Sequence, residues 1–413
     1  MNNTSLAMLP DLAQRYGTPL WVYDSATITE QIRQLQAFDV IRFAQKACSN
    51  IHILKLMREQ GLVVDAVSLG EIERALHAGF SPQGAPAGVV LTADMLDTQT
   101  LARVIELDIE VNAGSIDMLE QLGAAKPGHR VWLRINPGFG HGHSNKTNTG
   151  GENSKHGIWH TDLPLALAAI RKHGLQLVGL HMHIGSGVDY DHLHQVCDVM
   201  VKLVKQLGHD IEAISAGGGL SIPYREGEPR VDPDHYFGLW DASRKEIEAY
   251  LGHPVRLEIE PGRFLVAESA VLLSEVRAVK DNGANHFVLV DAGFNDLMRP
   301  SMYGSYHRIS VLQQPGMPRD AVTLRPTVVA GPLCESGDVF TQLEGGVVES
   351  RAIPEARVGD YLVFHDAGAY GASMSSNYNS RPLLAEVLIE AGEPRLIRRR
   401  QSIAELIALE TDV

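Results

Sequence analysis

The sequence predicts an α/β protein: a TIM-like (β/α)8 barrel followed by a mostly antiparallel β domain, either a barrel or a sandwich. Apolar, strand-like runs alternate with helical patterns from about residue 40 to residue 262, which is typical of a closed barrel of parallel strands. After Arg263 the runs become short, β-rich and separated by turns. We therefore expect a barrel over residues 25–270 and a β domain over residues 271–413, joined by the N-terminal segment 1–24.

Eight apolar runs are expected to form the barrel strands, because strands that are buried on both faces show nearly continuous apolar sequence. The segments between them place apolar residues at helical spacing, and Asn50 and Ser115 are plausible N-caps of two of these helices. The expected strands are 40–45, 62–67, 88–93, 108–113, 129–136, 175–184, 211–216 and 255–260, and the clearest helices are 50–60, 70–79 and 115–125.

The second domain is expected to contain five clear strands and one terminal helix. The strands are 274–281, 286–293, 327–332, 359–366 and 385–392, the helix is 402–410, and segment 20–24 is expected to join the same sheet. A polar, glycine-rich stretch at 141–157 interrupts the barrel after its fifth strand. It predicts a mobile surface loop, either a functional lid or a solvated insertion.

Composition excludes several classes of function. The chain has 413 residues, 36 basic and 50 acidic, so its net charge of −14 argues against non-specific binding to nucleic acid or to anionic membranes. Its apolar runs are shorter than the roughly 18 residues of a membrane span. Three cysteines are too few for a disulfide framework, and the N-terminus does not resemble a secretory signal. We expect a cytoplasmic protein.

Polar residues of unusual type fall at the carboxyl ends of the predicted barrel strands. Active sites of such barrels lie at this end, with phosphate commonly bound after strands seven and eight. The residues are Lys46, Asp65, Arg134, His183, Gly217, Gly218, Gly219, Glu260 and Arg263. Their common position predicts one active site in the barrel mouth.

These residue types suit an aldehyde cofactor, for which pyridoxal 5'-phosphate is the natural candidate. Lys46 is close in sequence to the apolar residues Ala44 and Ala47, and we expect burial to destabilise its ammonium and favour a Schiff base. The glycines can offer backbone N–H groups to phosphate. Glu260 can keep a pyridine nitrogen protonated, and Arg263 can bind an anion. Taken singly, Lys46 would be a surface lysine, and Glu260 with Arg263 a local ion pair.

His181 and His183 leave a second possibility open. Alternate residues of a strand face the same way, so the two imidazoles could be metal ligands of a barrel hydrolase. However, the pair lies on the sixth strand, and the sequence offers no further ligand cluster. Stacking of His183 on a cofactor ring, with Ser186 on the phosphate, fits the surrounding residues better, and we expect no metal.

The chain resembles the fold-type III pyridoxal-phosphate decarboxylases, and among them the diaminopimelate decarboxylases. The resemblance runs from about residue 21 to residue 382. The matching stretches are FAQKA (43–47), DAVSLGEIERAL (65–76), HIGSG (183–187), GGGLSIPY (217–224), EPGRFL (260–265), VDAGFNDLMRPSMYGSYH (290–307), GPLCESGD (331–338) and DAGAYGASMSSNYNSRP (366–382).

The resemblance implies decarboxylation of meso-2,6-diaminopimelate at its D-centre to give L-lysine, the last step of lysine biosynthesis. Lys46 would form the Schiff base with pyridoxal 5'-phosphate, and His183 would stack on its ring. Cys334 would be the catalytic proton donor. The other cofactor-binding residues would be Asp65, Ser186, Gly217, Gly218, Gly219, Glu260, Pro261, Gly262, Arg263 and Tyr370.

Substrate binding is implied for Arg263, Arg299, Tyr303, Glu335 and Tyr370. The resemblance also implies a homodimer in which Cys334 and Glu335 serve the neighbouring chain's Lys46.

Two features depart from the usual pattern of this family. Cys48 stands where many relatives have asparagine, and the segment before His156 is unusually long. The chain also reads KHG at 155–157, where the family usually has an aromatic residue before the glycine.

An ornithine- or arginine-type decarboxylase is the nearest alternative, although those enzymes usually have Cys-Asp where this chain has Cys334-Glu335. An alanine racemase fits less well, because it favours arginine at the ring nitrogen. A catalytically silent homologue would usually have lost Lys46 or Cys334.

Overall fold

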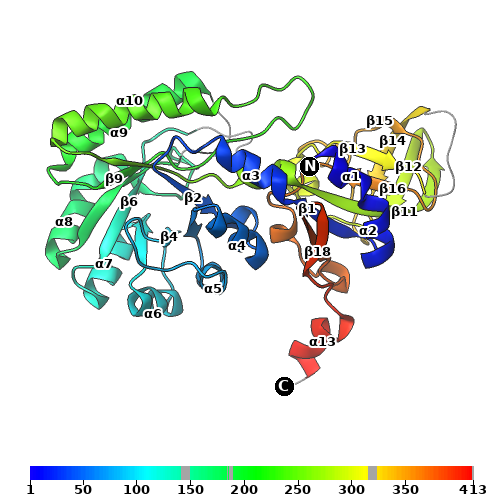
Figure 1. The fold of residues 1–413 in the computed structure, drawn as a ribbon, viewed down its shortest axis with the longest axis horizontal. Helices are drawn as coiled ribbons and strands as arrows, with labels where there is room; N and C mark the ends of the chain where they lie inside the picture. Colours follow the sequence, from blue (N-terminus) through cyan, green and yellow to red (C-terminus); the bar gives the residue numbers. More distant parts are fainter. Residues whose placement is uncertain (141–148, 184, 186–188, 315–322, 412–413) are drawn as a thin grey trace. The chain divides into compact units, whose positions relative to one another are not determined.

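The computed structural model describes residues 1–140, 149–183, 185, 189–314 and 323–411, and its contacts divide the chain into two units. The barrel unit comprises Ile32–Ser221 and Arg230–Phe264. The sheet unit comprises Met1–Gln31, Ile222–Pro229 and Leu265–Val413. Figure 1 labels the elements of both units.

The barrel unit contains a closed ring of eight parallel strands, as the apolar runs predicted. The ring follows the order β5-β4-β3-β2-β10-β9-β8-β6 and closes through the pair β5–β6. The strands are β2 (Val40–Ala44), β3 (Val63–Ala66), β4 (Val89–Ala93), β5 (Glu110–Ala113), β6 (Arg130–Asn136), β8 (Gln176–His181), β9 (Ala213–Ser215) and β10 (Arg256–Ile259). A two-residue strand that the sequence did not indicate, β7 (Ile158–Trp159), adds to β6.

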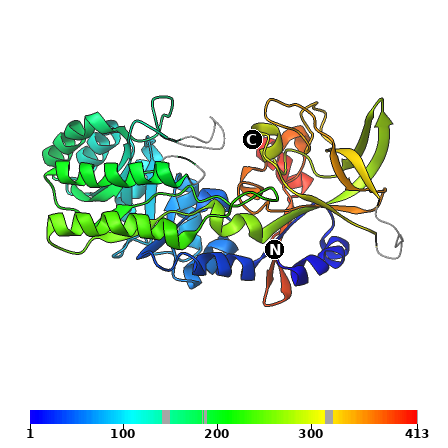
Figure 2. The same cartoon turned by 90° about the horizontal axis from the view of Figure 1, so that it is seen from above.

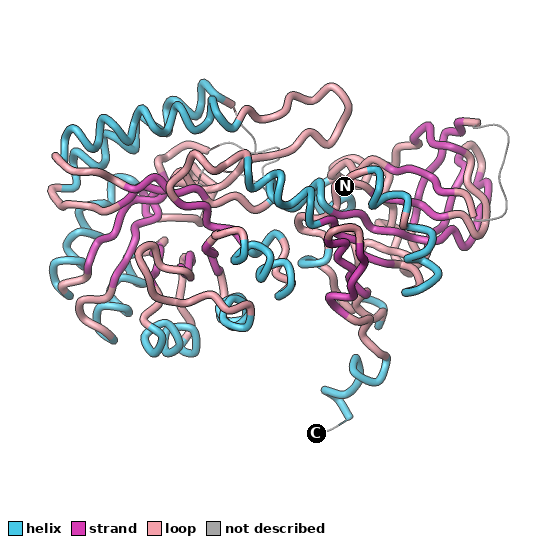
Figure 3. Tube along the Cα trace, viewed as in Figure 1, coloured by secondary structure: helices cyan, strands magenta, loops and turns pink. Residues whose placement is uncertain are grey.

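Helices cover the outside of this ring (Figure 3). They are α4 (Ile51–Glu59), α5 (Leu69–His77), α6 (Thr98–Leu107), α7 (Ile116–Ala125), α8 (Leu163–His173), α9 (Tyr190–Leu207) and α10 (Pro233–Leu251), with the short helices η1 (Gln45–Ala47) and η3 (His160–Asp162). The two predicted caps are confirmed: Asn50 accepts from His52 N at 2.9 Å, and Ser115 accepts from Met118 N at 3.3 Å. The long helices α9 and α10 pack side by side (Figures 1 and 2).

An ion pair is buried between neighbouring barrel strands. Arg42 on β2 contacts Glu258 on β10 at 2.9 Å, and both side chains are only 2% exposed. Arg42 also donates to the carbonyl of Ala87 at 2.9 Å. These contacts satisfy charges that would otherwise be costly at this depth.

The sheet unit is built on a largely antiparallel sheet in the order β15-β14-β12-β11-β1-β17-β18, with β16 pairing both β11 and β13. Its strands are β1 (Leu20–Asp24), β11 (Ala270–Asn282), β12 (Asn285–Val290), β13 (Ile309–Leu312), β14 (Leu324–Ala330), β15 (Arg351–Pro354), β16 (Tyr361–Phe364), β17 (Ala385–Glu390) and β18 (Glu393–Arg398). The pairs β1–β17 and β12–β14 are parallel.

The helices of the sheet unit are short. They are α1 (Asn3–Ala7), α2 (Leu9–Tyr16), α12 (Arg299–Tyr303), α13 (Ile403–Thr411), η4 (Ala267–Ser269), η5 (Ala372–Met374) and η6 (Tyr378–Ser380). Two more, α3 (Ser25–Arg33) and α11 (Arg263–Val266), run across the boundary between the units.

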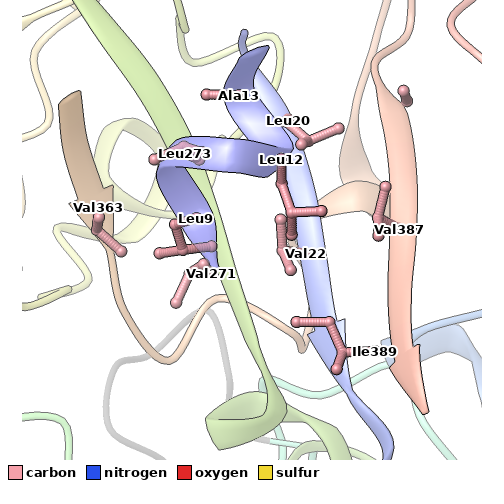
Figure 4. Packing of buried hydrophobic residues seen from close by; sticks show 11 residues of the cluster. Leu9, Leu12, Ala13, Leu20, Val22, Val271, Leu273, Val363, Val387 and Ile389 are labelled. Carbon is pink, nitrogen blue, oxygen red and sulfur yellow. The ribbon is translucent and has the colours of Figure 1, made fainter. Parts of the chain in front are cut away.

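An apolar cluster holds the sheet unit together (Figure 4). Leu9 and Leu12 of α2 pack on the sheet over β1, β11, β16 and β17. Leu9, Leu20 and Val22 are fully buried, and burying each such side chain stabilises the fold by about 1.5–3 kcal/mol.

Candidate active site

Lys46 lies on the short helix η1, directly after barrel strand β2. Its neighbours Gln45 and Ala47 are buried, whereas Lys46 itself is exposed. The burial of its ammonium that we expected from the apolar neighbours Ala44 and Ala47 is therefore wrong for this structure. The backbone of the segment is fixed, and the amine is accessible to a ligand.

The Glu260–Arg263 run packs directly against the Lys46 segment. Ala44 N donates to Pro261 O at 3.2 Å. A Cβ on Gly262 would lie 3.1 Å from Ala44 O and 3.2 Å from the Cβ of Ala47. A larger residue at Gly262 would push the two strand ends apart, so glycine is needed for this close approach.

Three consecutive glycines follow β9 and pack between His183 and Glu260. A Cβ on Gly217 would lie 2.1 Å from Met182 O, and one on Gly218 would lie 2.4 Å from Glu260 O. Gly219 has φ +101°, and a Cβ there would lie 2.2 Å from a backbone oxygen. The stretch is therefore a backbone surface without room for side chains, which is the property that a phosphate cradle requires.

His183 is held as a neutral imidazole. Its Nδ1 accepts a hydrogen bond from Gly218 N at 3.2 Å, so this nitrogen carries no proton. Burial, followed by the charges of Lys46, Arg134 and His181, lowers the pKa of His183 well below its usual value. A neutral ring next to the glycines can stack on a flat ligand without adding positive charge.

Glu260 is bound to His181, with 2.7 Å between Oε2 and Nε2. Burial raises the pKa of Glu260, but the charge and hydrogen bond of His181 and the charges of Arg42 and Arg134 outweigh burial and hold the pKa below its usual value. Glu260 is therefore an ionised carboxylate, able to hold a proton on a heterocyclic nitrogen.

Asp65, at the end of β3, has the opposite electrostatics. Burial, followed by the charge of Glu260, raises its pKa well above the ordinary value, although Lys46 and a hydrogen bond from Thr92 oppose the shift. Thr92, on β4, in turn accepts a hydrogen bond from the side chain of Asn112 on β5 at 3.2 Å. Oδ1 of Asp65 is buried and accepts no hydrogen bond, so it remains available to a ligand.

The described part of the polar loop, 149–157, is anchored to the barrel. Thr149 Oγ1 donates to His183 O at 2.9 Å. Asn136 at the end of β6 accepts from Gly151 N at 2.9 Å. His156 Nδ1 lies 2.6 Å from Oδ2 of Asp94. Residues 141–148 and Ser186 lie outside the described residues.

In the sheet unit, buried Asp338 shapes the loop that carries Cys334 and Glu335. Its carboxylate accepts from Phe294 N and Leu333 N, both at 2.7 Å, while burial raises its pKa. Cys334 is exposed and reduced, and its backbone N–H donates to the side chain of a residue on η6 at 2.8 Å. Glu335 is also exposed, so both side chains can reach a ligand.

Arg299 and Tyr303 lie at the two ends of helix α12, and Arg299 is only 4% exposed. Tyr370 lies in the loop after β16 with φ +57°, a conformation that is uncommon for a residue other than glycine. Such backbone conformations persist where the surrounding structure imposes them, often at functional sites.

Apart from Ser186, which lies outside the described residues, the structure brings the expected cofactor-binding residues of the barrel unit together at one end of the ring. The candidate substrate residues Arg299, Tyr303, Glu335 and Tyr370 all belong to the sheet unit. Sequence reasoning missed the bond between His181 and Glu260. The one sequence signal for this contact is that His181 and His183 are two residues apart on a strand, so their side chains point to the same face.

The residues present fit pyridoxal 5'-phosphate. The glycines form a cradle that side chains would fill, Glu260 is ionised, His183 is neutral and Lys46 is accessible. Among the described residues, no group of three or more His, Cys, Asp and Glu is arranged to hold a metal ion, and His181 is bound to Glu260. Within the same described ranges, no helix is both long and apolar enough to span a bilayer.

Comparison with known proteins gives one consistent result. Residues 25–267 match the family described as pyridoxal-dependent decarboxylase, pyridoxal binding domain. The chain is 69% identical over 399 residues to the diaminopimelate decarboxylase of Escherichia coli K12, covering 97% of this chain and 95% of that one. It is 67% identical over 400 residues to the diaminopimelate decarboxylase of Streptomyces coelicolor, covering 97% and 91%.

Solved structures agree. A crystal structure of diaminopimelate decarboxylase aligns with a TM-score of 0.95 at 69% identity, covering 97% of this chain and 96% of that one. Diaminopimelate decarboxylase from Helicobacter pylori, complexed with L-lysine, aligns with a TM-score of 0.85 at 32% identity, covering 97% and 99%.

Proposed function

The chain belongs to the pyridoxal-dependent decarboxylases and, within them, to the diaminopimelate decarboxylases, and from this premise we propose how its residues perform the reaction. The chain removes the carboxylate at the D-centre of meso-2,6-diaminopimelate and yields L-lysine and CO2, the last step of lysine biosynthesis. The observation that supports this most is the meeting of Lys46, His183 and ionised Glu260 at one end of a barrel whose relatives are 69% identical.

Pyridoxal 5'-phosphate, when bound, supplies an aldehyde and an electron-accepting ring that stabilises the charge left at the α-carbon when CO2 departs. Lys46 would hold the aldehyde carbon, and the glycines after β9 would hold the phosphate. Glu260, ionised by its contact with His181, would keep the proton on the ring nitrogen. His183 would stack on the ring without competing for that proton.

Substrate recognition would be shared among charged groups. Glu335 would bind the distal ammonium of the substrate. Arg299, with Arg263 and Tyr303, would bind the distal carboxylate, because a guanidinium can donate two parallel hydrogen bonds to a carboxylate. Such a site discriminates strongly against substrates without that carboxylate, since its own buried groups would then be unpaired. Tyr370 would contact both cofactor and substrate.

Cys334 would deliver the proton that replaces the departing carboxylate. Its side chain is an exposed thiol on a backbone that is held in place. We propose a homodimer in which Cys334 and Glu335 of the partner subunit complete the site around Lys46. Three free cysteines, one of them exposed, are compatible with a reducing compartment, and we place the protein in the cytoplasm.

Release of CO2 from purified holoenzyme tests the substrate. We expect turnover of meso-diaminopimelate and at least 100-fold lower kcat/KM for ornithine, which lacks the distal carboxylate and leaves buried polar groups unpaired. Turnover of ornithine alone would replace our proposal with an ornithine-type decarboxylase.

Lys46→Ala tests the cofactor site, with Lys55→Ala, an exposed lysine on α4, as the matched control. We expect Lys46→Ala to lose the cofactor's absorbance and its activity, and the control to keep both. Borohydride reduction and peptide mapping should find the label on Lys46. A labelled peptide elsewhere would contradict the assignment.

Mixing two inactive variants tests the shared site. If Cys334 acts on the partner's Lys46, random subunit exchange between equal amounts of Lys46→Ala and Cys334→Ala should restore about a quarter of wild-type activity, because half of the dimers are hybrids and each hybrid contains one intact site. Absence of rescue, with exchange demonstrated by differently tagged subunits, would contradict the shared site.

A further inference from the structure

Arg299 is held from two sides by uncharged groups of the sheet unit. Its Nη1 lies 2.9 Å from Nε2 of His307, and its guanidinium lies over the ring of Tyr224, 4.7 Å from the ring centroid. The rings of Tyr224 and His307 meet edge to face, with centroids 5.7 Å apart. Arg299 is 4% exposed and His307 is 2% exposed, so this arrangement is a packed one.

The donors and acceptors around His307 fix its protonation. Its Nδ1 lies 2.9 Å from the backbone carbonyl of His365, and a carbonyl can only accept, so Nδ1 carries a proton. Arginine can only donate, so Nε2 of His307 must accept from Arg299 through its lone pair. Both bonds exist together only in the neutral tautomer with the proton on Nδ1.

The backbone keeps His307 in this orientation. It lies just before β13, which pairs with β16, and His365 follows β16 directly. His365 N donates to Arg308 O at 2.9 Å, and Arg351 donates to His307 O at 3.0 Å. The imidazole is therefore fixed by the sheet, and its lone pair points at Arg299.

We propose that His307 is a positioning residue for substrate recognition: its Nε2 lone pair, with the face of Tyr224, aims the Arg299 guanidinium at the distal carboxylate of the substrate. This inference rests on the proposed function, since it presupposes that Arg299 binds that carboxylate. The imidazole and the phenol carry no negative charge, so these two contacts restrict the orientation of the guanidinium without neutralising it.

Restricting a long side chain in advance removes an entropy cost from binding. An unrestrained arginine loses rotamer freedom when it grips a carboxylate. The distal carboxylate does not react, so its contact is present in the ground state and the transition state alike. Loss of the contact should therefore raise KM for meso-diaminopimelate and leave kcat nearly unchanged.

Two conservative variants separate this role from a merely structural one. In His307→Gln, the amide oxygen can take the place of Nε2 and still accept from Arg299, while the bond to His365 is lost. In His307→Asn, the amide nitrogen can take the place of Nδ1 and still donate to His365 O, while the acceptor for Arg299 is lost. A positioning role predicts that Gln preserves substrate affinity and Asn does not.

The assay measures CO2 release from meso-diaminopimelate by purified holoenzyme. We expect His307→Asn to raise KM about 10- to 100-fold, the effect of losing one hydrogen bond to a charged group, with kcat within about threefold of wild type. We expect His307→Gln to raise KM by less than about fivefold. The reverse order, with Asn mild and Gln severe, would overturn the proposal.

D-lysine supplies the internal control, because it keeps the D-centre and the distal ammonium but lacks the distal carboxylate. Its inhibition constant against meso-diaminopimelate should differ by less than about twofold between wild type and His307→Asn. An equal loss of affinity for D-lysine would show general damage to the site and would overturn the proposal.

A double-mutant cycle ties the effect to Arg299. In an Arg299→Gln background, His307→Asn should have no further effect on kcat/KM, because the group that it positions is gone. Additive losses would overturn the proposal. If wild type itself fails to turn over meso-diaminopimelate, the proposed function fails rather than the role of His307.

Tyr224→Leu keeps the test decisive if His307→Asn does not fold. This variant removes the aromatic face beside Arg299 and leaves the bond between His307 and His365 in place. It should raise KM for meso-diaminopimelate at least threefold, from loss of a cation–π contact, with affinity for D-lysine unchanged. An unchanged KM would overturn the proposal.

Discussion

The contact between His181 and Glu260 yields a prediction about the pH dependence of activity. His181 Nε2 lies 2.7 Å from Glu260 Oε2, and the imidazole is 1% exposed. A hydrogen bond to a buried charged group contributes about 1.5–3 kcal/mol. Each pKa unit corresponds to about 1.4 kcal/mol, so His181→Leu should raise the pKa of Glu260 by about one to two units.

The sign follows from the role proposed for Glu260. The ionised carboxylate is the active form, so activity is lost as pH falls through its pKa. A raised pKa therefore moves the acid limb of the kcat profile to higher pH by about one to two units. His181→Gln is the matched control, because its amide nitrogen can take the place of Nε2 and still donate to the carboxylate. Its acid limb should stay within about half a unit of wild type.

The measurement is kcat of saturated holoenzyme with meso-diaminopimelate from about pH 3.5 to about pH 9, a range that extends below the ordinary pKa of a glutamate. Cofactor absorbance at each pH shows whether occupancy has changed. An acid limb that is unshifted in His181→Leu, with the cofactor fully bound, would refute the reasoning, because Glu260 would then owe its ionisation to other groups.

Three further predictions concern stability and cofactor binding. Glu258→Leu should lower the free energy of unfolding of the apoprotein by about 3–5 kcal/mol in urea, because it strands buried Arg42, and Arg42→Met added to it should recover part of that loss. Burial raises the pKa of Asp296 to about 7, above the unfolded value, so stability should fall as pH rises from 4 to 7, by about 4 kcal/mol at most; Asp296→Asn should flatten this slope in denaturant titrations. Gly218→Ala should abolish cofactor absorbance because its Cβ would lie 2.4 Å from a backbone oxygen, while Gly238→Ala, with open space at its Cβ, should bind normally.

The barrel could be predicted from sequence because its strands are buried on both faces. A run such as Val40–Ala44 is almost continuously buried and therefore almost continuously apolar. The sequence did not indicate strands β7, β13, β15 and β18, and each of them has only one buried residue. For example, β15 reads Arg-Ala-Ile-Pro, and β7 has only two residues. Their pairing depends on neighbours that are distant in the chain rather than on their own pattern.

The common placement of the candidate residues could be predicted from sequence, but their electrostatics could not. Position at a strand end depends on local pattern, and it predicted that Lys46, His183 and Glu260 lie at the same end of the barrel. Ionisation depends on neighbours brought in by barrel closure: His181 and Glu260 are 79 residues apart in the chain. The expectation of a buried Lys46 was wrong for the same reason, because apolar neighbours in sequence do not determine how a side chain is covered in space.

Two carboxyl groups in the barrel mouth show what this closure accomplishes. Asp65 and Glu260 repel each other, and burial disfavours the charged form of both. Glu260 is stabilised as an anion by the charge and hydrogen bond of His181 and the charge of Arg42, which outweigh burial. For Asp65, the charge of Lys46 and a hydrogen bond from the neutral hydroxyl of Thr92 do not outweigh burial and the charge of Glu260. The two pKa values are therefore pushed in opposite directions, which favours one anion and one protonated carboxyl. In the role that we propose for Glu260, a single negative charge would balance a cationic ring nitrogen, whereas two would leave an uncompensated buried charge.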